Sequence, residues 1–151
     1  MHCTSSTAFQ VRTVRTDDSA ADHRLRNRLR VWGPAAGWAA VLFLLSAWPD
    51  PGGISLLPFS DKVAHVGLYG ILGIALGYGW SRSPRPIAHG ILIALGALYG
   101  VTDEWHQVFV PGRVPDVADW LADVLGLILG YGAVVVFIRR LKRPIQMNGP
   151  E

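Results

Sequence analysis

Long apolar runs alternate with short polar connections along this chain. The runs cover residues 31–48, 63–80, 86–102 and 117–138. A transmembrane helix needs about 20 mainly apolar residues, within a range of about 17 to 25, and the first and third runs suffice once flanking residues are included. Tryptophans lie near the run ends, where an interfacial aromatic belt is found: Trp32, Trp48, Trp80, Trp105 and Trp120. The pattern predicts an all-α fold, an integral membrane bundle of four transmembrane helices.

A soluble helical bundle is the alternative to this interpretation. Of the 151 residues, 50% are hydrophobic, and no run has a polar face that could coat a buried core. The single cysteine, Cys3, has neither a disulfide partner nor metal-binding spacing. The net charge of +3 comes from arginine clusters at the ends of the chain, so we expect no nucleic-acid partner. Composition therefore favours a membrane protein whose partners are lipids.

Polar segments flank a single predicted domain. Residues 1–29 are rich in arginine and poor in large apolar residues, which predicts a disordered N-terminal tail, with a helix near "RLRNRLR" left open. This segment does not look like a signal peptide, because no small-residue cleavage site follows the first apolar run. Residues 30–143 are the predicted four-helix transmembrane domain, and residues 144–151 are a C-terminal tail.

Basic residues alternate between the connections, which predicts an orientation. Arginines precede the first run, separate the second from the third, and follow the fourth, whereas residues 49–60 contain no Lys or Arg. Basic residues are concentrated in cytoplasmic loops, so we expect both termini in the cytoplasm. Lys62 and Arg113 are the exceptions, and both fall on the predicted outer side.

The unusual polar residues gather on that outer side. A charged residue at the centre of a transmembrane helix costs about 2.5–3.5 kcal/mol, and less toward the interface, so it persists where it is paired, hydrated or functional. These residues open the second run, close the third, occupy the outer loop and open the fourth: Asp61, Lys62, His65, Asp103, Glu104, His106, Gln107, Arg113, Asp116, Asp119 and Asp123. Helical spacing groups several of them on shared faces. We expect one polar site at the outer mouth of the bundle.

Some of these carboxylates also have a structural explanation. Asp61 and Asp116 are suited to cap the N-termini of helices. Asp119 and Asp123 lie too deep for capping, which predicts either a functional role or an ion pair with Arg113 or Lys62 that fixes the loop. The loop "VPGRVPDVAD" should turn back toward the mouth, and we expect its Arg113 within hydrogen-bond reach of Glu104, Asp119 or Asp123.

A metal ion is a further candidate for this mouth. Suitable ligand types occur at His65, Asp103, Glu104, Asp119 and Asp123. No H-E-x-x-H pattern is present, and Glu104 and His106 are two residues apart, which points them to different sides of a helix. We therefore expect no metal and no other cofactor. His89, at the inner end of the third run, is given only an interfacial role.

Each run also contains a G-x-x-x-G pattern, at residues 33–37, 73–77, 96–100 and 126–130. Small residues let helices approach closely in lipid, which favours a compact bundle. The glycine-rich composition of membrane helices explains each pattern equally well when it is taken alone.

Three ordered motifs, "SDKVAHVGLYGILG", "DEWHQVFVPGR" and "DVADWLADVLGLILG", resemble the VanZ-like family of small bacterial membrane proteins over residues 60–130. The family pattern is D-K-x-x-H, then an acidic E-x-x-Q segment ending in Arg, then D-x-x-x-N and G-x-x-x-G. By position the resemblance implies a polar set of Asp61, Lys62, His65, Glu104, Gln107, Arg113 and Asp119. Asp123 stands where the family usually has Asn.

The resemblance implies a role in the bacterial plasma membrane and cell envelope. The family takes its name from an accessory protein linked to low-level protection against teicoplanin, a glycopeptide that binds cell-wall precursors. No established reaction accompanies the resemblance.

Two classes of function would use this polar set. One is a non-catalytic envelope protein whose outward-facing site binds a lipid head group, a wall precursor or a glycopeptide. The other is an intramembrane hydrolase or transferase acting on a lipid-linked phosphate, with Glu104 or Asp119 as general base, His65 as proton shuttle, and Arg113 with Lys62 as phosphate clamp. The sequence contains no clear nucleophile and indicates no oligomeric state. Transport ranks last, because the first and fourth runs have apolar inner halves.

Overall fold

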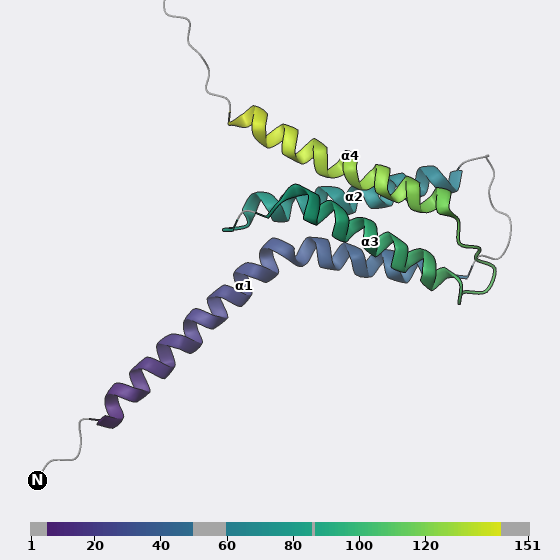
Figure 1. Cartoon of the computed structure of the whole chain (residues 1–151). Coiled ribbons are helices and arrows are strands. Elements are labelled where there is room, and N and C mark those ends of the chain that lie inside the picture. Colours follow the sequence, from purple (N-terminus) through teal and green to yellow (C-terminus); the bar gives the residue numbers. More distant parts are fainter. Residues whose placement is uncertain (1–5, 50–59, 86, 143–151) are drawn as a thin grey trace, which may run out of the picture.

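The computed structural model describes residues 6–49, 60–85 and 87–142, with side chains from residue 20 onward. It contains four helices in this part of the chain: α1 (Ser6–Ser46), α2 (Ser60–Arg82), α3 (His89–Gln107) and α4 (Val117–Leu141). In Figure 1, α2 and α3 lie alongside the second half of α1, and α4 lies on the other side of them, packed against α2. The predicted all-α membrane bundle of four helices is confirmed.

Three stretches are long and apolar enough to cross a membrane: Ala20–Ser46, Asp61–Arg82 and Val117–Leu141. The remaining helix, α3, has 19 residues, and its last turns are polar, with Asp103, Glu104, His106 and Gln107. These residues lower its mean hydropathy. The bundle therefore contains one helix whose polar end must lie near the membrane surface or inside the protein.

The first half of α1 departs from the sequence-based expectation. Residues 1–29 were expected to form a disordered tail with a helix left open near residues 24–30; that helix is present, but α1 already begins at Ser6. Arginine and alanine are favourable helix formers, and Asp22 pairs with Arg26 at 2.7 Å, one turn apart. In Figure 1 this half extends away from the bundle, and α1 bends where it joins the bundle. The helix contains Pro34, which lacks the N–H that a straight helix requires. The C-terminal tail, residues 144–151, lies outside the described residues.

Glycines bring α2 and α4 into backbone contact. A Cβ atom on Gly126 would overlap the carbonyl of Val66, and one on Gly130 would overlap the carbonyl of Gly70. From the other side, a Cβ on Gly73 would overlap the carbonyl of Leu127. Only glycine permits this approach. The two helices run parallel, so residues near their starts are also held together.

The remaining G-x-x-x-G patterns, on α3 and α1, differ in whether their glycines pack against another helix. On α3, a Cβ on Gly96 would meet the Leu127 side chain, and one on Gly100 would meet Trp120. Gly33 and Gly37 of α1 have no neighbour within 4 Å among the described residues. The close packing predicted from these patterns is therefore wrong for α1, because this face of α1 does not meet another described helix.

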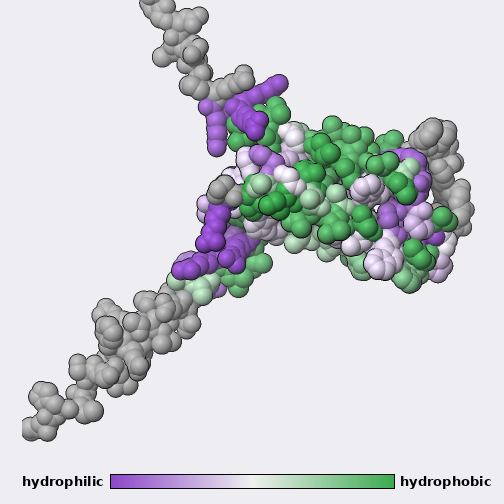
Figure 2. Space-filling view, viewed as in Figure 1, coloured by the Kyte–Doolittle hydropathy of each residue, from purple (hydrophilic) through white to green (hydrophobic). Residues whose placement is uncertain are grey.

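The outer surface of the bundle is apolar over its middle. Large side chains such as Leu98, Leu129 and Phe137 are exposed. Figure 2 shows hydrophobic residues across the middle of the bundle and polar residues toward its two ends. A soluble protein rarely exposes so much contiguous apolar surface, whereas lipid would cover it. The chain is a multi-pass membrane protein.

Candidate functional site

A ladder of ionic pairs joins the starts of α2 and α4. The Lys62 Nζ lies 2.7 Å from Asp119 Oδ1 and 3.0 Å from Asp116 Oδ2. One turn deeper, His65 Nδ1 lies 2.8 Å from Asp123 Oδ1. Gly126 and Gly130 follow on the same stripe of α4 and contact α2 directly. The close approach at the glycines therefore holds the two polar faces opposite each other.

The end of α3 contributes the third side of the site. Glu104 accepts a hydrogen bond from the backbone N–H of Asp116 at 3.0 Å, and Gln107 Nε2 donates to Glu104 Oε1 at 3.4 Å. Asp103 Oδ2 accepts a hydrogen bond from the Tyr69 hydroxyl at 3.2 Å. These contacts connect α3 to α2 and to the loop that precedes α4. The predicted convergence of polar residues from three helix ends is present in the structure.

A cavity of about 340 Å³ opens beside these residues. Its lining comes from α1, α2, α3 and the loop after α3: Leu42, Leu45, Ser46, Trp48, Asp61, Ala64, His65, Leu68, Tyr69, Asp103, Gln107 and Arg113. One part of this lining is apolar and the rest carries carboxylate, imidazole, amide and guanidinium groups. The cavity could therefore accept a molecule that has both an apolar and a charged part.

Arg113 does not make the contact that the sequence predicted. Its Nε donates to the backbone carbonyl of Trp48 at 3.3 Å, and among the described residues no carboxylate lies within 4.0 Å of its guanidinium. The preceding Gly112 has a φ of 81°, a backbone conformation that glycine adopts readily, and this turn carries Arg113 toward the end of α1. The predicted pairing of Arg113 with Glu104, Asp119 or Asp123 is wrong, and Lys62 pairs with Asp119 instead.

The two predicted N-caps have different outcomes. Asp116 caps α4, since its side chain accepts the Ala118 N–H at 2.9 Å. This hydrogen bond and the nearby Lys62 ammonium hold the pKa of the Asp116 carboxyl below its usual range. Asp61 is not the N-cap of α2, because the helix already begins at Ser60; it lies in the first turn, where a carboxylate interacts favourably with the helix dipole.

Several of these polar groups are deeply buried. Asp123 is fully buried, and Asp103, Glu104 and Gln107 are 5–8% exposed. Asp123 Oδ2 and Asp103 Oδ1 have no hydrogen-bond partner among the described residues. One ligand atom from each of His65, Glu104 and Asp123 lies within 4.8 Å of the others. Buried carboxylate oxygens without partners are costly, so the site has capacity for another donor or a cation.

Tyr69 belongs to this site although it was not among the polar residues expected at the mouth. It is 1% exposed and donates to Asp103, which was expected at the mouth but is not part of the polar set implied by the family resemblance. Helical spacing could have indicated Tyr69, because it lies one turn along α2 from His65. What spacing could not show is that the faces of Tyr69 and Asp103 meet.

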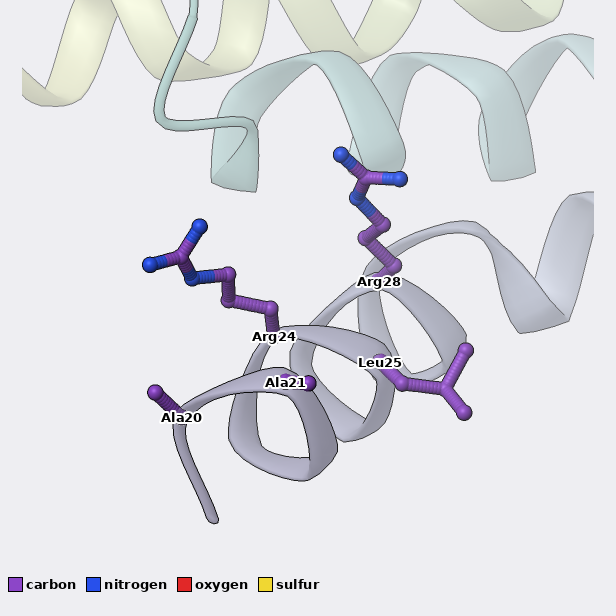
Figure 3. A pocket seen from close by; sticks show the side chains of 5 residues that line it. All are labelled: Ala20, Ala21, Arg24, Leu25 and Arg28. Atoms are coloured by element: carbon purple, nitrogen blue, oxygen red, sulfur yellow. The ribbon is translucent and has the colours of Figure 1, made fainter. Parts of the chain in front are cut away.

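A second polar region occupies the opposite end of the bundle. Arg24 and Arg28 of α1, together with Arg85, line a cavity of about 500 Å³. Figure 3 shows the Arg24 and Arg28 side chains pointing from α1 toward a neighbouring stretch of chain. Nearby, His89 Nδ1 lies 2.7 Å from the Tyr131 hydroxyl, and its ring packs against Trp80 in a tilted arrangement. Basic residues therefore lie at one end of the bundle and the carboxylate-rich site at the other.

Comparisons with known proteins agree with the motifs. No curated protein and no solved structure matches this chain significantly. A family model described as VanZ/LLP1 matches residues 8–139, which extends beyond the motif region of residues 60–130 on both sides. Because this match covers most of the chain, the protein belongs to the VanZ/LLP1 family.

Proposed function

We propose that this protein binds the phosphate-bearing head group of an envelope lipid, such as a lipid-linked wall precursor, at a site on the outer side of the bacterial plasma membrane. The observation that carries the proposal is the mixed lining of the 340 Å³ cavity. Leu42, Leu45 and Leu68 offer an apolar wall, and His65 and Arg113 offer hydrogen-bond donors beside it. A lipid has this combination of an apolar chain and a charged head.

Arg113 is the residue best suited to contact the phosphate. Its Nε donates to a backbone carbonyl, and its terminal nitrogens have no carboxylate partner among the described residues. A guanidinium presents a planar fork that matches two phosphate oxygens. The Lys62 ammonium, in contrast, already pairs with Asp116 and Asp119, so we no longer assign it to a phosphate clamp.

A role in glycopeptide protection is part of this proposal. The resemblance links the family to teicoplanin, which acts on wall precursors. A protein that binds such a precursor, or the glycopeptide itself, would alter the access of one to the other. The outer polar site supports an envelope role of this kind.

Arg113→Gln is expected to lower the amount of bound lipid by about ten- to hundredfold, since a hydrogen bond to a charged group contributes roughly 1.5–3 kcal/mol. The measurement is mass spectrometry of lipids that remain with the purified protein. Arg139→Gln, which removes an arginine at the opposite end of the bundle, is the control and should retain the lipid. Equal retention by both variants would contradict the proposed site.

Mass spectrometry of a lipid incubated with the purified protein separates binding from catalysis. The His65–Asp123 contact at 2.8 Å favours an enzyme as the second candidate, because a buried carboxylate can orient an imidazole for proton transfer. Incubation with a lipid-linked phosphate would return the lipid unchanged from a binding protein. Release of phosphate, abolished by His65→Gln, would instead establish the hydrolase or transferase alternative.

The orientation with both termini in the cytoplasm is also proposed, and cysteine labelling tests it. In a Cys3→Ser background, Ser55→Cys should react with a membrane-impermeant maleimide in intact cells, because the connection at residues 49–60 contains no basic residue. Ser83→Cys lies between Arg82 and Arg85 and should react only after lysis. The reverse result would place the carboxylate-rich site on the cytoplasmic side.

A further inference from the structure

The charges at the carboxylate-rich end do not balance among the described residues. Lys62 lies within 4.0 Å of Asp61, Asp116 and Asp119. Arg113 donates to a backbone carbonyl, and among the described residues it lies within 4.0 Å of no carboxylate. The buried carboxylates that remain are Asp103, Glu104 and Asp123, and the charged partner available to them is the imidazole of His65.

Such an arrangement is unfavourable without a further positive charge. Isolated ionised carboxylates are strongly disfavoured in a low-dielectric interior, and neutral hydrogen-bond donors compensate them only in part. Here Asp123 Oδ2 and Asp103 Oδ1 lack any such donor among the described residues. Protonation is one solution. A bound divalent cation is the other, and the positions of the ligand atoms favour it.

The candidate ligands come from three different helices. His65 lies on α2, Glu104 on α3 and Asp123 on α4, and one ligand atom of each lies within 4.8 Å of the others. A zinc ion binds nitrogen and carboxylate oxygen at about 2.0–2.2 Å in tetrahedral geometry, so its ligand atoms are about 3.3–3.6 Å apart, and side-chain rotations would bring the set to that spacing. One carboxylate oxygen of Asp123 contacts His65, and the other has no hydrogen-bond partner among the described residues.

We propose that His65, Glu104 and Asp123 form a binding site for one divalent transition-metal ion, Zn²⁺ or Mn²⁺. One imidazole nitrogen with carboxylate oxygens suits these ions better than Ca²⁺ or Mg²⁺, which prefer ligand sets made of oxygen alone. Three protein ligands leave a coordination position open. His65 also lines the 340 Å³ cavity, so the proposed metal site borders that cavity.

This site revises the expectation that the chain binds no metal. Metal motifs are found in sequence when ligands share one helix or one loop, and these ligands are separated by 39 and 19 positions. The inference goes beyond the proposed lipid binding and does not depend on it. A cation would nevertheless explain how a cavity bordered by carboxylates could accept an anionic head group.

The test measures metal alone, with no lipid added. The full-length protein, without a histidine tag, is purified in detergent, stripped with a chelator, dialysed and incubated with Zn²⁺ or Mn²⁺. Elemental analysis is expected to find about one ion per chain, and thermal unfolding should occur at a higher temperature with the ion than without it. Glu104→Gln should weaken binding by about ten- to hundredfold or more, the range seen even when supporting residues of metal sites are changed.

Matched variants keep the result interpretable. Glu104→Gln retains a side-chain oxygen that can accept the Asp116 N–H, so this variant should fold. Asp123→Asn tests a second proposed ligand in the same way. If Asp123→Asn does not fold, the result with Glu104→Gln decides the outcome. Asp22→Asn removes an exposed carboxylate on the first half of α1, which is not among the proposed ligands, and should bind metal normally. Absence of stoichiometric metal would overturn the site, as would equal loss in Asp22→Asn and Glu104→Gln. Because lipid binding is measured separately, either proposal can fail without the other.

Discussion

Replacing Gly130 with alanine is expected to destabilise the protein by about 1–3 kcal/mol, the usual cost of inserting an extra methyl group into a close-packed site. The new Cβ would overlap the backbone carbonyl of Gly70. A backbone group cannot rotate away as a side chain can, so α2 and α4 would have to separate. Lys62–Asp119 and His65–Asp123 join the same two helices, and their geometry should be disturbed as well.

Thermal unfolding in detergent measures this effect, and Gly132→Ala provides the control. Gly132 lies two residues further along α4 and has nothing within 4 Å of the position of a Cβ among the described residues. Alanine is intrinsically better than glycine in a helix by about 1 kcal/mol, so Gly132→Ala should be neutral or stabilising. Equal stability of the two variants would mean that the backbone contact between α2 and α4 does not hold the bundle together.

Replacing Lys62 with glutamine is expected to lower the melting temperature more than replacing Asp119 with asparagine. Lys62→Gln leaves Asp61, Asp116 and Asp119 without their shared cation. Asp119→Asn leaves Lys62 still paired with Asp116 at 3.0 Å. The double variant should be more stable than the sum of the two single losses predicts, because it removes the cation and one of its carboxylates together.

A double-mutant cycle of thermal unfolding measures this coupling, and an envelope phenotype such as glycopeptide susceptibility is recorded beside it. Lys142→Gln, an exposed lysine just after α4, controls for the loss of one positive charge. If Lys62 and Asp119 stabilise the bundle, the phenotype should follow stability and recover partly in the double variant. Strictly additive losses would contradict the coupling of Lys62 and Asp119, whereas loss of the phenotype with unchanged stability would make Lys62 part of the ligand site.

Much of this architecture was predictable because it depends on local sequence. The length of an apolar run limits what can cross a bilayer, and the spacing of residues along a helix decides which of them share a face. The polar residues therefore could be assigned to three helix ends before their contacts were known. The α4 cap at Asp116 follows from the same local rules. Local rules failed for the other predicted cap, Asp61, since α2 already starts at Ser60.

Only the tertiary structure decided which of these residues meet. Helices that are apolar on most sides give no clear signal of their rotation about their own axes, and the sequence therefore could not choose between Arg113 and Lys62 as the partner of Asp119. The backbone contacts of Gly126 and Gly130 with α2 set that rotation and register. They place Lys62 opposite Asp119 and His65 opposite Asp123, while the turn at Gly112 takes Arg113 to Trp48. The convergence of His65, Glu104 and Asp123 is likewise a product of helix packing, because these residues are distant in sequence and belong to three separate helices.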